Sequence, residues 1–300
     1  MANGIWTNGA GTGNVQTAGN WSDAAAPADG GSQQWGTQAG SVANVTAGMD
    51  LDTFLGAGAE GLNKIVVYDY YTGLIGNSSA DPLIVDVNVG TTPYVDFRGS
   101  GASQLFLKGT CTKVVVDSSS TASPCVALIG TKTCASVQVA RGAVRYYTGL
   151  TATNTYVIPA VGIPGAAYLT IDSGAVPTNL YIRGGTVTSA AAPTTLLDIR
   201  AGTYTQTGPN SGTWATMNVD GGGVVYWNTP GQTITALNVW GGGVFDASRI
   251  GGIGTITTLS IFSESARVIL DRRITVTNPI VSYVRQPQLA SAAAQTVTWV

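Results

Sequence analysis

Carboxylates are the side chains of this sequence that could carry acid–base chemistry, because the chain contains no histidine. The 16 acidic residues are dispersed. Hydrolysis of a glycosidic bond needs two carboxyl groups, one as the acid and one as the nucleophile or base. Three pairs have a spacing that could place two carboxylates on one surface: Asp50 with Asp52, Asp81 with Asp86, and Asp198 with Asp220.

A structural role is the alternative for these acids, since an outward Asp beside a turn commonly caps that turn. Asp198 and Asp220 occupy outward or near-corner positions in successive copies of a similar segment, so we expect them to support turns there. The only adjacent basic pair, Arg272 and Arg273, is interpreted as two solvated arginines beside a strand. We therefore predict no catalytic residues and no enzymatic activity.

Three cysteines, Cys111, Cys125 and Cys134, are the remaining reactive side chains. The sequence has no CxxC pair, so a zinc site would have to combine single cysteines with carboxylates. Calcium needs several clustered oxygens, and no nonapeptide calcium repeat is present. We predict no metal, no cofactor and buried thiols.

The elements that must position these residues follow from a repeated pattern, φ-x-φ-x-x-G-x-φ, in which φ is apolar. The first two apolar residues have period two and face one side of a strand. The glycine marks a bend, and the last apolar residue returns to the core. Copies begin at Val137, Leu169, Leu180, Leu197, Met217 and Leu237, with a copy lacking glycine at Leu259 and a degraded copy at Val85.

The spacing of these copies predicts stacked coils of about 20 residues each. Leu169 and Leu180 are too close for a full coil, so we place Leu169 on a second face, with a segment near Val157 supplying the first-face strand. Cys111 and Cys134 occupy equivalent positions in two similar segments and should lie on adjacent coils. Their geometry would permit a disulfide, although we expect reduced thiols.

The composition also favours an all-β fold, because only 10% of the residues are charged and 40 are glycine. We predict a right-handed parallel β-helix, or β-solenoid, with a small N-terminal cap; a β-sandwich is the alternative. The predicted cap or attachment region is 1–60, with Trp6, Trp21 and Trp35 as its large side chains; the solenoid is 61–285, and a C-terminal strand or tail is 286–300.

The charge and hydropathy of the chain bear on three kinds of partner or location: nucleic acid, membrane and the secretory route. The net charge is −2 and the basic residues are scattered, which predicts no nucleic-acid binding. No apolar run approaches the roughly 20 residues of a membrane helix. The N-terminus has no basic and apolar regions of the secretory type, so we expect synthesis in the cytoplasm.

The opening, with Trp6 and the pair Asn20–Trp21 before Pro27, is followed by the glycine-cornered coils and resembles two families. One comprises the passenger solenoids of bacterial autotransporters; the other comprises β-helical virion proteins of tailed phages, including head decoration proteins and fibre or tailspike domains. We expect no export signal and no C-terminal membrane barrel, which favours the phage family.

The phage resemblance implies a structural protein of the virion, made in the host cytoplasm. A capsid decoration or cement protein is the form we expect, assembling as a homotrimer on the major capsid protein. Outward aromatics such as Tyr181 and Trp240 would suit subunit contacts. The alternatives are a carbohydrate-binding or carbohydrate-cleaving β-helix of a tailspike or fibre, and a surface adhesin. A carbohydrate binder should show exposed stacked aromatics beside acids in one groove.

Overall fold

The chain divides into two compact units in the computed structural model. Unit 1 comprises residues 1–153 and 160–168, and unit 2 comprises 154–159 and 169–300. The structure describes residues 18–22, 24, 32–35, 64–69, 71–75, 83–84, 94–129, 133–159, 166–191, 195–208, 211–285, 287–291 and 297–299.

Unit 1 is built from short strands that pair in parallel with strands of the next coil. One row runs from β2 through β5 and β7 to β9, and a second runs from β6 through β8 to β9. A 3-10 helix, η1 (Ala18–Asn20), precedes the buried Trp21. The strands that begin in unit 1 are β1 (Ser32–Trp35), β2 (Lys64–Val67), β3 (Leu74–Ile75), β4 (Leu83–Ile84), β5 (Tyr94–Phe97), β6 (Gln104–Lys108), β7 (Cys111–Asp117), β8 (Val126–Ile129), β9 (Thr133–Tyr146), β10 (Thr151–Val157) and β11 (Ala167–Ile171).

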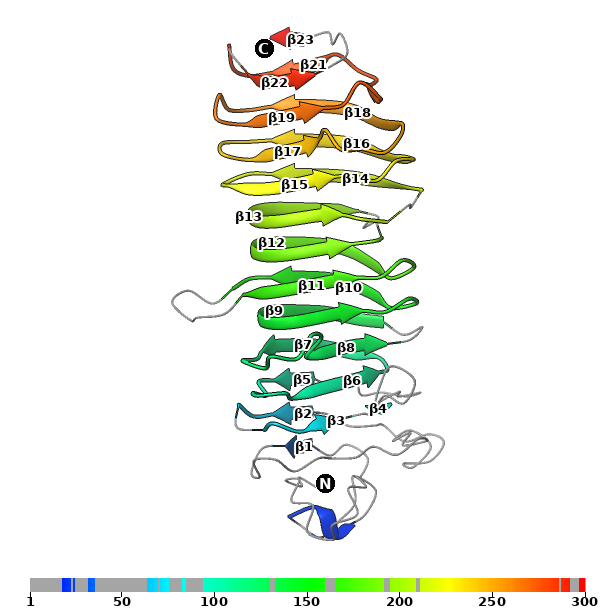
Figure 1. The fold of residues 1–300 in the computed structure, drawn as a ribbon, viewed down its shortest axis with the longest axis vertical. Helices are drawn as coiled ribbons and strands as arrows, with labels where there is room; N and C mark the ends of the chain where they lie inside the picture. The colour runs from blue at the N-terminus through cyan, green and yellow to red at the C-terminus, as the bar shows by residue number, and fades with distance from the viewer. Residues whose placement is uncertain are drawn as a thin grey trace. The chain divides into compact units, whose positions relative to one another are not determined.

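Unit 2 repeats the same parallel pairing, with successive coils following one another from β12 to β23 (Figure 1). One row runs β13–β14–β16–β18–β21–β23, and another runs β13–β15–β17–β19–β22. The strands are β12 (Val176–Ser189), β13 (Leu196–Gln206), β14 (Gly212–Val219), β15 (Gly223–Trp227), β16 (Gln232–Val239), β17 (Val244–Ala247), β18 (Gly254–Ile261), β19 (Arg267–Leu270), β20 (Ile274–Val276), β21 (Ile280–Ser282), β22 (Gln288–Ser291) and β23 (Val297–Trp299). The predicted parallel β-solenoid is confirmed.

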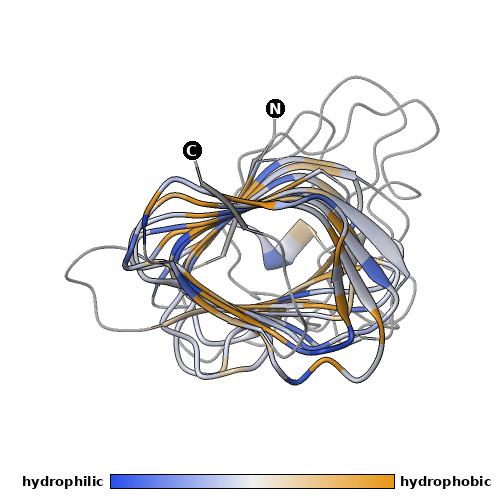
Figure 2. Cartoon of the chain, turned by 90° about the horizontal axis from the view of Figure 1, so that it is seen from above, coloured by the Kyte–Doolittle hydropathy of each residue, from blue (hydrophilic) through white to orange (hydrophobic). Residues whose placement is uncertain are grey.

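The core of each unit is the interior of its coils. Hydrophobic and hydrophilic residues alternate along the strands when the coils are viewed end-on (Figure 2). At the paired apolar positions of the repeat, both side chains are buried, as in Met217 and Val219, while the residue between them, Asn218, is half-buried. The period-two pattern therefore places the residues as the sequence predicts.

The glycine of the repeat is a corner with a left-handed backbone. In all six copies that have it, φ lies between 76° and 97°. These residues are Gly142, Gly174, Gly185, Gly202, Gly222 and Gly242. The last apolar residue returns to the core in some coils only. The triple-glycine corners are one residue longer, so Gly202 pairs with Gly223 and the buried position falls on Val225 rather than on Val224.

In the two triple-glycine corners, the first glycine, Gly221 or Gly241, differs in whether a side chain would fit. Gly241 has no positive φ, and a Cβ there would meet only ordinary contacts at 3.5 Å. Gly221 has a φ of 57°, and a Cβ there would lie 2.6 Å from the carbonyl oxygen of Arg200. Gly221 therefore tolerates a side chain no better than Gly222, because both residues have left-handed backbones and the closer contact is at Gly221.

Leu169 lies on the second face, as its spacing predicts. It belongs to β11, and Ala190 at the end of β12 donates its N–H to the carbonyl of Ile171. β10 pairs with the first half of β12 and so supplies the first-face strand, which ends rather than begins at Val157.

The terminal regions meet the predictions only in part. Most of the predicted cap at 1–60 lies outside the described residues, as do Trp6 and the side chain of Trp35. At the other end, β23 pairs in parallel with β21, with Ile280 opposite Val297. The final strand therefore finds its partner within unit 2. The boundaries at 60 and 285 stay predictions.

Candidate functional site

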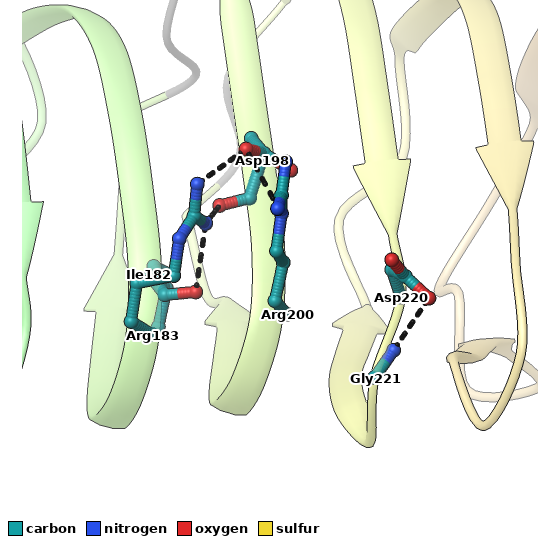
Figure 3. A network of polar contacts seen from close by, with 6 residues as sticks. All are labelled: Ile182, Arg183, Asp198, Arg200, Asp220 and Gly221. Atoms are coloured by element: carbon teal, nitrogen blue, oxygen red, sulfur yellow. Dashed lines mark hydrogen bonds and ion pairs between the residues drawn. The ribbon is translucent and has the colours of Figure 1, made fainter.

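A polar cluster of unit 2 joins Arg183, Asp198 and Arg200 (Figure 3). Asp198 occupies the middle position of a φ-x-φ strand, opposite Tyr181 of the preceding coil, and only 8% of it is exposed. Arg183 Nη2 donates to Asp198 Oδ2 at 2.6 Å, and its Nη1 donates to the carbonyl oxygen of Asp198 at 3.0 Å. Arg200 Nε lies 3.7 Å from the same carboxylate oxygen.

Asp220 does not join this cluster. Its Oδ1 accepts the N–H of Gly221 at 2.8 Å, and Figure 3 shows it directed at its own turn. Asp198 faces Asn218 in the next coil, so the residue nearest to it in that direction carries no charge. The structure therefore brings Asp198 together with two arginines instead of with a second carboxylate. The prediction that Asp220 caps a turn is confirmed, whereas the same prediction for Asp198 is wrong, because its carboxylate lies mid-strand and pairs with arginines.

The cluster is suited to holding coils together. Arg183 lies on β12 and Asp198 on β13, so their hydrogen bonds link adjacent coils. A charge-assisted bond of this kind, largely removed from water, is stronger than a neutral one. A hydrolase would need a second carboxyl group within about 5–9.5 Å to act on the same bond. The other candidate acids, Asp50, Asp52, Asp81 and Asp86, lie outside the described residues.

The three cysteines are free and buried. Cys111 and Cys134 are direct register partners on β7 and β9, which confirms that the offset between them is one coil. The hydrogen bond between these two thiols and their burial raise the pKa of Cys111 well above its usual value. Burial also raises the pKa of Cys125 to about 11. The raised pKa values keep the Cys111 and Cys125 thiols protonated at neutral pH, so these two are not activated as nucleophiles, whereas the hydrogen bond with Cys111 lowers the pKa of Cys134.

Aromatic side chains form two outward columns in unit 2. Tyr156 and Tyr181 stack with ring centroids 4.9 Å apart. Trp240, Phe262 and Tyr283 stack in sequence, with centroid distances of 4.8 and 4.6 Å and interplanar angles of 7° and 8°. We call the latter three residues the aromatic column. They could have been found from the sequence, because Trp240 and Phe262 occupy the same position of two repeat copies.

The stacking limits what the aromatic column can bind. A sugar ring packs on the face of an aromatic ring, and the facing surfaces of these three rings are already in contact with one another. Along its side the column presents ring edges, while Trp240 and Tyr283, at its two ends, each keep one ring face outside these stacks, and Tyr283 is 48% exposed. Ring edges in a row suit contact with another protein surface better than stacking of a saccharide chain.

No group of three or more His, Cys, Asp or Glu residues that could hold a metal ion occurs among the described residues. In the same part of the chain, none of the helices has the length and apolar character needed to cross a membrane. Comparison with known proteins finds no matching family model, curated protein or solved structure. A solenoid fold by itself does not define a function, so the sites must carry the argument.

Proposed function

We propose that this protein is a structural component of a tailed-phage virion, and in particular a capsid decoration protein that assembles as a homotrimer on the major capsid protein. The fold suits such a role, because parallel ladders along each stack of coils make a rigid body whose outward positions are free for contacts. The resemblance of the Trp-containing opening and the glycine-cornered coils to phage virion proteins supports the virion in particular.

The observation that carries the proposal is the aromatic column. Apolar rings at outward positions of three successive coils form a stripe rather than a scatter of single residues. Contiguous apolar surface of this kind commonly marks a protein–protein contact. The C-terminal strand does not add to this argument, since β23 is paired within unit 2.

The charge pattern is consistent with subunit packing. Only 10% of the chain is charged. In the column's own coils, the middle positions of the strands are uncharged, with Asn238, Ser260 and Val281 in successive coils. Depletion of charge around apolar and aromatic residues is the composition found at the centres of protein interfaces.

Location on the virion decides the proposal. Gradient-purified particles of a phage that carries the gene should contain the chain in proportion to the major capsid protein, and immunogold labelling should place it on the head. Labelling of the tail tip instead would favour the fibre or tailspike alternative. Absence of the chain from purified virions would overturn both of these assignments.

A further inference from the structure

A cavity of about 350 Å³ opens on the surface of unit 1. One wall is the segment 118–123, SSSTAS in sequence, which connects β7 to β8 and is called the serine loop below. The opposite wall consists of Arg141–Ala143, at the corner of β9, together with Ala166 and Tyr168. A volume of this size lies at the lower end of the range for small-molecule sites.

The serine loop is held rigidly against the preceding coil. Ser118 Oγ donates to the carbonyl of Gly99, and Ser120 Oγ donates to the carbonyl of Ser103 at 2.7 Å. The amide and the hydroxyl of Thr121 both donate to the carbonyl of Gly101, at 2.7 and 2.9 Å. The cavity is therefore formed before any ligand arrives, and binding would not have to order the loop.

The charge inside the cavity is balanced. Arg141 lines it, and its Nε lies 3.0 Å from Asp117 Oδ1 while its Nη2 donates to the carbonyl of Asp117 at 3.3 Å. This pairing fixes the guanidinium and offsets its charge. Arg141 is the one charged side chain among the described lining residues, so the site favours a neutral ligand over phosphate or a carboxylate.

The remaining lining groups combine hydroxyls with one aromatic ring. The hydroxyls of Ser119 and Ser123 have no hydrogen-bond partner among the described residues and can bond a ligand. Tyr168, on β11, is 50% exposed and offers an apolar ring beside them. Hydroxyl donors and acceptors next to an aromatic ring match a small molecule that has many hydroxyls and an apolar C–H face.

We propose that this cavity is a binding site for a single neutral hexose unit, free or at the end of a glycan. The site is separate from the aromatic column and does not depend on a role in the capsid. It would let a structural β-solenoid attach to glycans without cleaving them. A bound hexose would place its C–H face on Tyr168 and its hydroxyls toward Arg141 and the serine loop.

Saturation-transfer NMR on the full chain tests the site, with the methyl glycosides of glucose, galactose, mannose and N-acetylglucosamine as probes. At least one should receive saturation, and Tyr168→Ala should weaken its binding about tenfold, because the aromatic face under the sugar is lost. Tyr226→Ala is the matched control, since Tyr226 is also exposed but lies on β15 in unit 2. It should bind as the unaltered chain does.

A second variant leaves the hydroxyls, Arg141 and Tyr168 unchanged and fills the cavity. Ala166 is exposed and lines the cavity, so Ala166→Trp should abolish binding while the melting temperature stays that of the unaltered chain. The proposal is overturned if no glycoside of the panel receives saturation, or if Ala166→Trp folds and still binds. It is also overturned if inorganic phosphate or glucuronate binds at this site in preference to all neutral probes.

Discussion

At the residue scale, the contacts of Asp198 require a negative charge, whereas the contact of Asp220 requires only a hydrogen-bond acceptor. Asp198 is nearly buried and accepts hydrogen bonds from Arg183, whereas Asp220 needs only an acceptor for the N–H of Gly221. Asp198→Asn should lower the free energy of unfolding by about 1.5–3 kcal/mol, the usual value for a hydrogen bond to a charged group. Asp220→Asn keeps an acceptor oxygen and should change the free energy of unfolding by less than about 0.5 kcal/mol. Urea denaturation of both variants measures the difference, and equal effects would contradict this account of the cluster.

The corner glycines allow a second comparison between neighbours. Gly242 has a φ of 77°, whereas Gly241 has no positive φ and space for a Cβ. Gly242→Ala should therefore lower the free energy of unfolding by about 1–3 kcal/mol, the cost of a non-glycine residue held in the left-handed region. Gly241→Ala should be close to neutral. A thermal melt that ranks the two variants in the opposite order would refute the corner assignment.

Cys125 should make stability depend on alkaline pH. Its pKa is about 11 in the folded chain, because burial disfavours the thiolate. In the unfolded chain the thiol ionises near its ordinary value of 9.0, so the stabilising contribution is complete below pH 9 and is lost as pH rises toward 11. Urea denaturation in the presence of a reductant, between pH 8 and about 10.5, should show a decline that is shallower in Cys125→Ala. Parallel declines in the two proteins would show that Cys125 contributes nothing.

At the element scale, the aromatic column links three coils through ring contacts as well as through backbone ladders. Phe262 is the middle ring, so Phe262→Ala removes both stacks. We expect the free energy of unfolding to fall by about 1–3 kcal/mol, from two aromatic pairs at roughly 0.5–1.5 kcal/mol each. Tyr226→Ala, at an exposed tyrosine outside the column, should cost much less. Calorimetric melts of the two variants provide the comparison.

The sequence predicts the elements better than it predicts the contacts between them. The repeat defines which residues are buried and where the backbone turns, because burial and left-handed φ constrain the residue type at each position. Contacts between coils also depend on coil length, which varies. Asp198 faces Tyr181, 17 residues earlier, whereas Leu237 faces Met217, 20 residues earlier.

This variation explains what was missed at the candidate site. A uniform step of about 20 residues does not place Arg183 beside Asp198, so the ion pair between coils was not predicted. The cavity of unit 1 depends on how the serine loop folds onto Gly99, Gly101 and Ser103, and no repeat pattern describes that loop. Local periodicity contains no information about such irregular connections.

At the scale of the whole molecule, unit 2 derives its order from contacts between neighbouring coils. The inner coils of unit 2 pair with the coil before and the coil after, so a change in one coil alters the contacts of its neighbours. Outward side chains add further contacts between adjacent coils along the stack. One of these is the hydrogen bond from Asn238 to Asn218 at 3.0 Å. The surface along the side of the stack therefore presents similar side chains at the same position of successive coils.

Assembly is the prediction that belongs to this scale. If the aromatic column is the contact between subunits, light scattering at micromolar concentration should give three times the chain mass of 30.6 kDa. Closed symmetry is the usual way for soluble proteins to cover such stripes. Tyr283 is the most exposed ring of the column, so Tyr283→Ser should shift the trimer toward the monomer, and it should destabilise the fold less than Phe262→Ala because it removes one stack rather than two; Tyr226→Ser should leave the trimer intact. A monomer of 30.6 kDa that also fails to bind capsids would contradict the structural proposal and place the carbohydrate alternative above it.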